Sequence, residues 1–338
     1  MERLTGSFSL LLVFLAFAYL SHLPLASADA PRIVRTPSAQ KEYRRHRQLT
    51  AIERGVRPPL HTSDTSEPPI KYRGRPMMTK NPSINVYLIY YGSWPEGSGQ
   101  NIIENFIQSL SADSDQQGSP ADPQVKLWWA ISVAYTQEVN GTKTNVSSQV
   151  RLAKTVYDDY SAGTDFGNDT VWEVVSNKIG DGKPFPYDVD GIYLLLSSTD
   201  VTVPDLCTKL VGWHNMRFID SAPVAFGFVG HPGGQCNQDW IRNPSPNGNP
   251  AIDFMIPIIG HEIAEAATDP EVETGWADEN REENVDKCHD VYGDTKTGQD
   301  SSGGTYEYNV VGLNNMRFLI PSNWDWEKNM CVIQRNYP

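Results

Sequence analysis

The chain has 338 residues, of which 39% are hydrophobic and 10% aromatic, so it is long enough to bury the core of one large domain or two small ones. Its formal net charge is -13 at pH 7. A surface this acidic repels nucleic-acid phosphates, which argues against a nucleic-acid partner.

The N-terminus has the pattern of a secretion signal. Arg3 precedes an apolar run over residues 8–20, and the small residues Ala-Ser-Ala-Asp-Ala follow at positions 26–30. The run is shorter than the roughly 20 apolar residues that a transmembrane helix needs, and no later stretch is a candidate membrane span. We therefore predict a signal peptide over residues 1–30 and a secreted, extracellular product; the alternative is an uncleaved anchor.

Residues 31–80 are basic, contain several prolines and lack apolar periodicity. Such a composition cannot make a packed core, so a disordered basic leader is predicted here. The run Arg44-Arg45-His46-Arg47 can be a processing site that releases a pro-segment, or simply part of a solvated linker. A globular domain is predicted over residues 81–338.

Within this domain, apolar strands alternate with segments of helical periodicity. Strands are predicted over residues 84–92, 190–196 and 224–229, and helices over residues 102–110, 125–135, 148–160, 170–179 and 253–270. Strands separated by helices predict a single layered α/β domain, in which helices cover a central sheet. Beyond Cys288 the pattern shortens into strands and turns.

The cysteines predict two disulfides. An even number of cysteines in a secreted chain usually forms disulfide bonds, and the lack of a C-x-x-C spacing argues against a zinc cluster. Of the three possible pairings we favour the one in which each bond closes a moderate loop between neighbouring segments. It joins Cys207 to Cys236 and Cys288 to Cys331.

Three sequons predict an N-glycosylated protein. Their asparagines must lie on the surface if they are modified in the secretory compartment. They are Asn140, Asn145 and Asn168.

The segment over residues 253–270 carries the strongest sign of chemistry. It is apolar nearly all round, as in a core helix, yet His261, Glu265 and Asp269 follow one another at helical spacing and Glu262 stands beside the first. Buried carboxylates are costly unless a cation, a hydrogen-bond network or water satisfies them. The alternative is that Glu262 and Glu265 face solvent while Asp269 merely ends the helix.

The sequence His-Glu-Ile-Ala-Glu over residues 261–265 is similar to the H-E-x-x-H helix of zinc peptidases, with Glu265 in place of the second histidine. In such a zincin-like arrangement, His261 and Glu265 are metal ligands and Glu262 is the general base that activates a water. A ligand set this rich in oxygen suits a divalent metal such as zinc, and equally manganese, iron or calcium.

A further metal ligand is expected from the acidic segment before Cys288. Glu283 and Asp286 lie there, next to a predicted disulfide that would hold them in place. Three other histidines, His214, His231 and His289, are expected to be hydrogen-bonded loop residues, although His214 or His231 could reach the same site. The sequence lacks a glycine-rich phosphate loop and a Gly-x-Ser-x-Gly elbow, which argues against nucleotide binding and serine hydrolysis.

The ordered motifs of the chain resemble the EXORDIUM or phosphate-induced protein family of plant extracellular proteins. The resemblance covers most of the mature chain and implies secretion to the apoplast or cell wall and an association with growth, including brassinosteroid-linked cell expansion; no settled biochemical activity comes with it. Its marks are Asn85 to Gly92, Phe106 to Ser111, Trp128-Trp129, Gly212-Trp213-His214, Gln235-Cys236, Gly303 to Tyr306, and Phe318 to Cys331.

Two functional hypotheses follow. The first is an extracellular, divalent-metal-dependent hydrolase, peptidase-like, that acts on an extracellular peptide or a cell-wall component. The second is a noncatalytic cell-wall or growth-signalling protein that uses a bound ion only for structure, or binds none.

Overall fold

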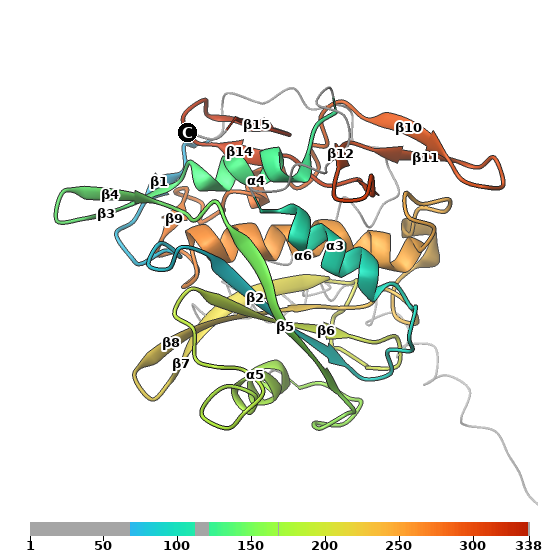
Figure 1. Cartoon of the computed structure of the whole chain (residues 1–338), viewed down its shortest axis with the longest axis horizontal. Coiled ribbons are helices and arrows are strands. Elements are labelled where there is room, and N and C mark those ends of the chain that lie inside the picture. The colour runs from blue at the N-terminus through green and yellow to red at the C-terminus, as the bar shows by residue number, and fades with distance from the viewer. Residues whose placement is uncertain (1–67, 112–121, 168, 337–338) are drawn as a thin grey trace, which may run out of the picture. The chain divides into compact units, whose positions relative to one another are not determined.

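The computed structural model of the chain describes residues 68–111, 122–167 and 169–336 (Figure 1). The predicted signal peptide and most of the predicted leader lie outside these residues, as does Asn168. The other two predicted glycosylation sites, Asn140 and Asn145, are exposed on a hairpin, where a glycan would have room. Among the described helices, none combines the length and the apolar character that crossing a membrane requires.

A mixed five-stranded sheet forms the centre of the domain. Four strands are parallel, and β7 runs antiparallel to β8 at one end of the spatial order β5-β2-β6-β8-β7. The interior strands β2 and β6 are buried along nearly their whole length, as their apolar runs predict. The strands are β2 (Ile84–Tyr91), β5 (Val150–Asp158), β6 (Gly191–Ser197), β7 (Gly212–Ile219) and β8 (Ala222–Val229).

Helices cover both faces of the sheet, which confirms the predicted α/β class. In Figure 1, α3, α4 and α6 lie on one side of the sheet and α5 on the other. The apolar side chains between these layers belong to one core. The helices are α3 (Gln100–Ser109), α4 (Val125–Val133), α5 (Thr170–Ser176) and α6 (Pro250–Thr268).

The C-terminal part forms short two-stranded pairs above the helices, as the sequence predicts. It is attached to α4 and the residues after it: the indole of Trp128 donates a hydrogen bond to the carbonyl of Pro321 (2.9 Å), and the Tyr135 hydroxyl to that of Trp324 (2.7 Å). The remaining elements are β1 (Lys71–Tyr72), β3 (Thr136–Val139), β4 (Thr142–Asn145), η2 (Gln238–Trp240), β9 (Trp276–Ala277), η3 (Asp286–Cys288), β10 (Lys296–Gln299), β11 (Thr305–Tyr308), β12 (Val310–Val311), β13 (Arg317–Phe318), β14 (Asn323–Asp325) and β15 (Met330–Val332).

Three sequence expectations differ from the fold. Residues 148–160, predicted as a helix, contain strand β5, and His214, expected at a loop position, lies on β7. Both strands lie at the ends of the sheet order, where one side of the strand has no neighbour in the sheet and the apolar run is incomplete. The folded part also begins before residue 81, because β1 pairs with β9 and the side chains of Met77 and Met78 are buried.

Both favoured disulfides are present, Cys207–Cys236 and Cys288–Cys331. The second bond joins η3 to β15, and it therefore holds the residues just before Cys288 against the C-terminal strands.

We predict that replacing both Cys288 and Cys331 with serine lowers the free energy of unfolding by about 3 to 4 kcal/mol, because the bond closes a loop between residues 43 positions apart. Urea denaturation of the wild type and the double variant measures the difference. A difference in the free energy of unfolding below about 1 kcal/mol would show that this disulfide does not stabilise the fold as predicted.

Candidate metal centre

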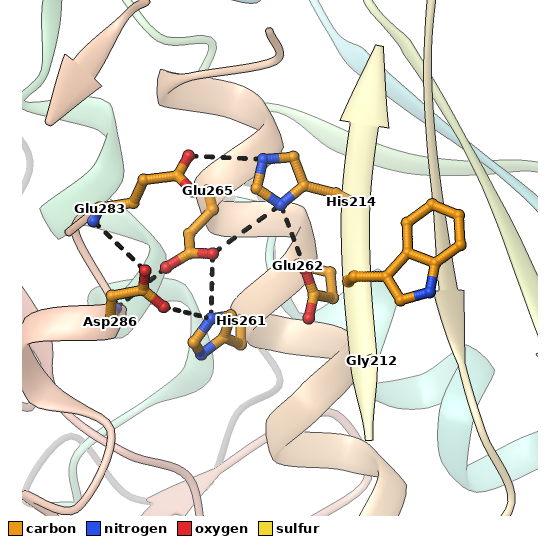
Figure 2. A pocket seen from close by; sticks show the side chains of 8 residues that line it. Gly212, His214, His261, Glu262, Glu265, Glu283 and Asp286 are labelled. Carbon is orange, nitrogen blue, oxygen red and sulfur yellow. Dashed lines mark hydrogen bonds and ion pairs between the residues drawn. The ribbon is translucent and has the colours of Figure 1, made fainter. Parts of the chain in front are cut away.

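Two histidines and four carboxylates from three separate segments meet in one pocket (Figure 2). The pocket has about 20 Å³ of space for water-sized groups, and Gly212 and Trp213 complete its lining. The ionisable residues are His214 on β7; His261, Glu262 and Glu265 on α6; and Glu283 and Asp286 in the segment that ends in η3.

Helix α6 presents its polar residues from a buried position. Asn249 is its N-cap, and the Asn249 side chain accepts a hydrogen bond from the Ile252 amide (3.3 Å). Pro250 is the first residue of the helix. Gly260 lets the helix approach α3 closely, because a Cβ atom there would lie 2.9 Å from Phe106. The side chains of Glu262 and Glu265 are therefore buried, which contradicts the alternative in which they face solvent.

A first group of donor atoms gathers around His261. Its Nε2 lies 2.9 Å from Glu265 Oε2 and 3.1 Å from Asp286 Oδ1. The Asp286 amide donates a hydrogen bond to the other oxygen of Glu265, Oε1, at 3.0 Å. The helical period thus places His261 and Glu265 on one face, and η3 brings Asp286 to them; the three can hold a metal ion.

A second group gathers around His214. Its Nδ1 lies 3.1 Å from Glu262 Oε2 and 3.8 Å from Glu265 Oε2. His214, Glu262 and Glu265 are all buried and can also hold a metal ion. Glu265 belongs to both groups.

The expected loop position of His214 was wrong, since the residue lies on β7 and points toward α6 (Figure 2). Alternate residues of a strand share a face, so His214 lies on the same face as Gly212 and Met216, but polar and apolar residues do not alternate here and no period-two pattern marks the strand in the sequence.

Glu283 is the least satisfied member of the cluster. Its side chain is buried, and Oε1 accepts no hydrogen bond from the described residues. The Nε2 atom of His214 lies 3.4 Å from that oxygen. A buried carboxylate oxygen in this state points to an ion or a water as its partner.

The pKa values of the cluster reflect burial and crowded negative charge. Burial alone lowers the pKa of His261 and His214, but the neighbouring carboxylates, led by Glu265 for the first and Glu283 for the second, raise both well above the usual range. Burial raises the pKa of Glu265 well above its usual range, and the charge of Asp286 raises it further. A cation in the pocket would favour the ionised carboxylates.

Asp269 ends α6 and shapes the turn that follows it. Its carboxylate accepts hydrogen bonds from the amides of Glu273 (2.7 Å), Thr274 (2.9 Å) and Gly275 (2.6 Å). Its backbone carbonyl lies 3.3 Å from His214 Nε2. Asp269, the third polar residue at helical spacing after His261 and Glu265, therefore does not line the pocket but contacts His214 through its backbone.

A buried ion pair holds the acidic segment in place. Lys287 Nζ lies 2.9 Å from Asp278 Oδ2, and both side chains are fully buried. The other oxygen of Asp278 accepts hydrogen bonds from the amides of Asn280 (2.8 Å) and Glu282 (2.9 Å). The turn between β9 and η3 is thereby fixed, and with it the positions of Glu283 and Asp286.

The two remaining histidine candidates do not line the pocket. His231 follows β8; its Nδ1 accepts a hydrogen bond from the Gly233 amide (3.0 Å), and burial lowers its pKa to about 4. His289 directs Nδ1 to the carbonyl of Asp286 (2.8 Å) and Nε2 to Asp290 (3.1 Å).

Comparison with known proteins identifies the relatives of this chain. The family model described as phosphate-induced protein 1 conserved region matches residues 70–334. The chain is 32% identical over 291 residues to Protein EXORDIUM-like 3 of Arabidopsis thaliana, covering 78% of this chain and 82% of that protein. It is 29% identical over 290 residues to Protein EXORDIUM-like 5 of the same plant, covering 77% and 76%. Protein PHOSPHATE-INDUCED 1 of Nicotiana tabacum is 28% identical over 279 residues, covering 73% and 83%. No solved structure matches significantly.

We predict that Lys287→Met lowers the free energy of unfolding by about 3 to 5 kcal/mol, because it leaves the Asp278 carboxylate buried without its cation. Urea denaturation measures the loss. Lys209→Met is the matched control: Lys209 pairs with Asp205 at 2.8 Å on the exposed surface, and its loss costs about 1 kcal/mol or less. Equal effects of the two substitutions would contradict the structural role of the buried pair.

Proposed function

The chain belongs to the phosphate-induced protein 1 family, which includes the EXORDIUM-like proteins, and we propose that it is a secreted, divalent-metal-dependent hydrolase of that family, acting on extracellular peptides. One observation carries the proposal. His261 Nε2, Glu265 Oε2 and Asp286 Oδ1 converge beside a pocket, and Glu262 lies next to them on the same helix.

The first donor group fits a small divalent cation. Bonds of about 2.0 to 2.1 Å from zinc to nitrogen and oxygen place neighbouring ligand atoms slightly more than 3 Å apart. The distances of 2.9 and 3.1 Å from His261 Nε2 to the two carboxylate oxygens are close to that spacing. Two of the three donors are carboxylate oxygens, so manganese, iron or calcium suits the group as well as zinc does, and Glu283 lines the same pocket.

Glu262 is placed to act as the general base. A divalent cation in this position supplies a water molecule of lowered pKa. Glu262 is buried beside the first donor group, and its Oε2 lies 3.1 Å from His214 Nδ1. In peptide hydrolysis Glu262 takes one proton from the attacking water and passes it to the leaving amine as the amide bond breaks.

The size of the pocket limits what can enter it. Sites for small organic ligands usually measure about 300 to 1,000 Å³. With about 20 Å³ of space for a group the size of a water molecule, this pocket suits an ion or a single reacting group, while the substrate itself stays outside. A peptide bond or another hydrolysable linkage in a cell-wall polymer meets this description.

Two further features support secretion. Both cysteine pairs are disulfide-bonded, which suits an oxidising compartment. The relatives also include Protein PHOSPHATE-INDUCED 1, and the family resemblance implies the apoplast or cell wall.

A noncatalytic growth-signalling or cell-wall role is the second candidate function. It is favoured by the burial of the ligands: Glu265 is 2% exposed and His214 3%. Structural metal sites are closed in this way, whereas catalytic sites keep one position open to substrate.

Three purified proteins separate the two functions: the wild type, His261→Ala and Glu262→Gln. We predict that the wild type carries a stoichiometric divalent metal by inductively coupled plasma mass spectrometry and cleaves a fluorogenic peptide library. His261→Ala loses the ion held by the first donor group. Glu262→Gln keeps that ion and loses a factor of about 10² to 10⁴ in rate, because the base is removed.

Glu279→Gln is the matched control, since Glu279 is an exposed carboxylate of the same acidic segment and should change neither metal content nor rate. A metal-bound wild type that cleaves no peptide, with Glu262→Gln of unchanged stability, would favour the noncatalytic function. A wild type free of metal would overturn the proposal.

We further predict that chelation destabilises the protein. Without the cation, the like charges of Glu265 and Asp286 repel each other in a buried site, and binding energy is lost from the folded state. Differential scanning calorimetry with and without EDTA should show a lower melting temperature after chelation, restored by added zinc or manganese. An unchanged melting temperature in metal-depleted protein would contradict this coupling.

A further inference from the structure

We infer that the pocket binds two divalent cations, one in each donor group, bridged by the carboxylate of Glu265. The inference rests on the proposed function, because the first cation is the one held by His261, Glu265 and Asp286. The second lies between His214, Glu262 and Glu265.

The geometry of Glu265 is that of a bridging ligand. Within each donor group all ligand atoms lie within 4.8 Å of one another, and Glu265 is common to both. Its Oε2 lies 2.9 Å from His261 Nε2 and 3.8 Å from His214 Nδ1, so imidazoles from a helix and a strand approach one oxygen (Figure 2). Paired metal ions in hydrolases stand about 3.5 to 4 Å apart, a separation that a shared carboxylate spans.

The hydrogen-bond partners of His214 point to a second cation. Its Nε2 faces the backbone carbonyl of Asp269 at 3.3 Å, and because a carbonyl only accepts, Nε2 carries the ring proton of the neutral imidazole. A cation between Nδ1 and the carboxylates of Glu262 and Glu265 would take the place of a proton on Nδ1. Metal-bound histidines typically donate their other N–H to a carbonyl or carboxylate, as here.

The charges of the pocket favour a second cation. Glu262, Glu265, Glu283 and Asp286 together carry four negative charges when ionised, and each side chain is less than a tenth exposed. With one divalent cation on a neutral His261, a protonated His214 still leaves one negative charge uncompensated in a buried site, whereas two cations with neutral histidines neutralise the four carboxylates. Uncompensated buried charge is strongly unfavourable.

Gly212 leaves room for the second group. A Cβ atom at this position would lie 3.1 Å from Glu262 Oε1 and 2.5 Å from the side chain of Ile258. Glu262 can therefore direct Oε2 to the second cation while Oε1 stays on the Gly212 side of the pocket. The second donor group is thus built by β7 and α6, independently of the segment that carries Asp286.

Metal counting on the full secreted chain tests the inference. Wild-type protein is loaded with Mn²⁺, passed through a desalting column and analysed for manganese. We expect two ions per chain in the wild type and one in His214→Gln. Glu262→Gln should also retain one, the ion held by His261, and provides a second readout if His214→Gln fails to fold.

His231→Gln is the matched control, because His231 lies outside both donor groups, and it should keep two ions. Electron paramagnetic resonance gives an independent signature: His214→Gln should show the six-line signal of isolated Mn²⁺, and the wild type an exchange-coupled signal from the pair. One ion per chain in both wild type and His214→Gln would overturn the inference while leaving the proposed function intact. No ion in either would overturn both.

Discussion

The burial of the Glu265 carboxylate is the constraint on which the candidate site depends. The residue is 2% exposed on a largely apolar helix, so its charge must be satisfied by groups close to it. His261 comes from the same helix, His214 from an edge strand, and the amide of Asp286 from the segment after β9. Removing any one of these elements would leave a buried carboxylate that α6 alone cannot accommodate.

The segments that carry these residues are held in place by several interactions. The acidic segment is fixed on one side by the buried pair of Lys287 and Asp278 and on the other by the Cys288–Cys331 disulfide. The carboxylate of Asp269 ties the end of α6 to the next turn through three backbone amides. A cluster of like charges destabilises a fold, and these interactions hold the segments that carry it in place.

Sequence reasoning found the part of the site that short-range rules describe. The helical period places His261 and Glu265 on one face, and proximity to Cys288 pointed to Glu283 and Asp286. It offered His214 only as one of two loop histidines that could reach the site, because the residue reaches the pocket through the antiparallel pairing of β7 with β8, a contact that no local pattern encodes. The two terminal strands of the sheet, β5 and β7, were also missed for one reason: each lies beside a single neighbouring strand and keeps several polar residues, whereas the interior strands β2 and β6 are largely apolar.

The direction of β7 explains why the site lies where it does. In open α/β sheets, ligands generally bind at the carboxyl ends of the parallel strands. Because β7 runs antiparallel, its first residue, Gly212, pairs with Val229, the last residue of β8, and His214 pairs with Gly227 just behind it. A parallel edge strand would instead place its C-terminal residues beside Val229. The antiparallel direction of β7 therefore places His214 near the carboxyl end of β8 and next to the carboxylates of α6.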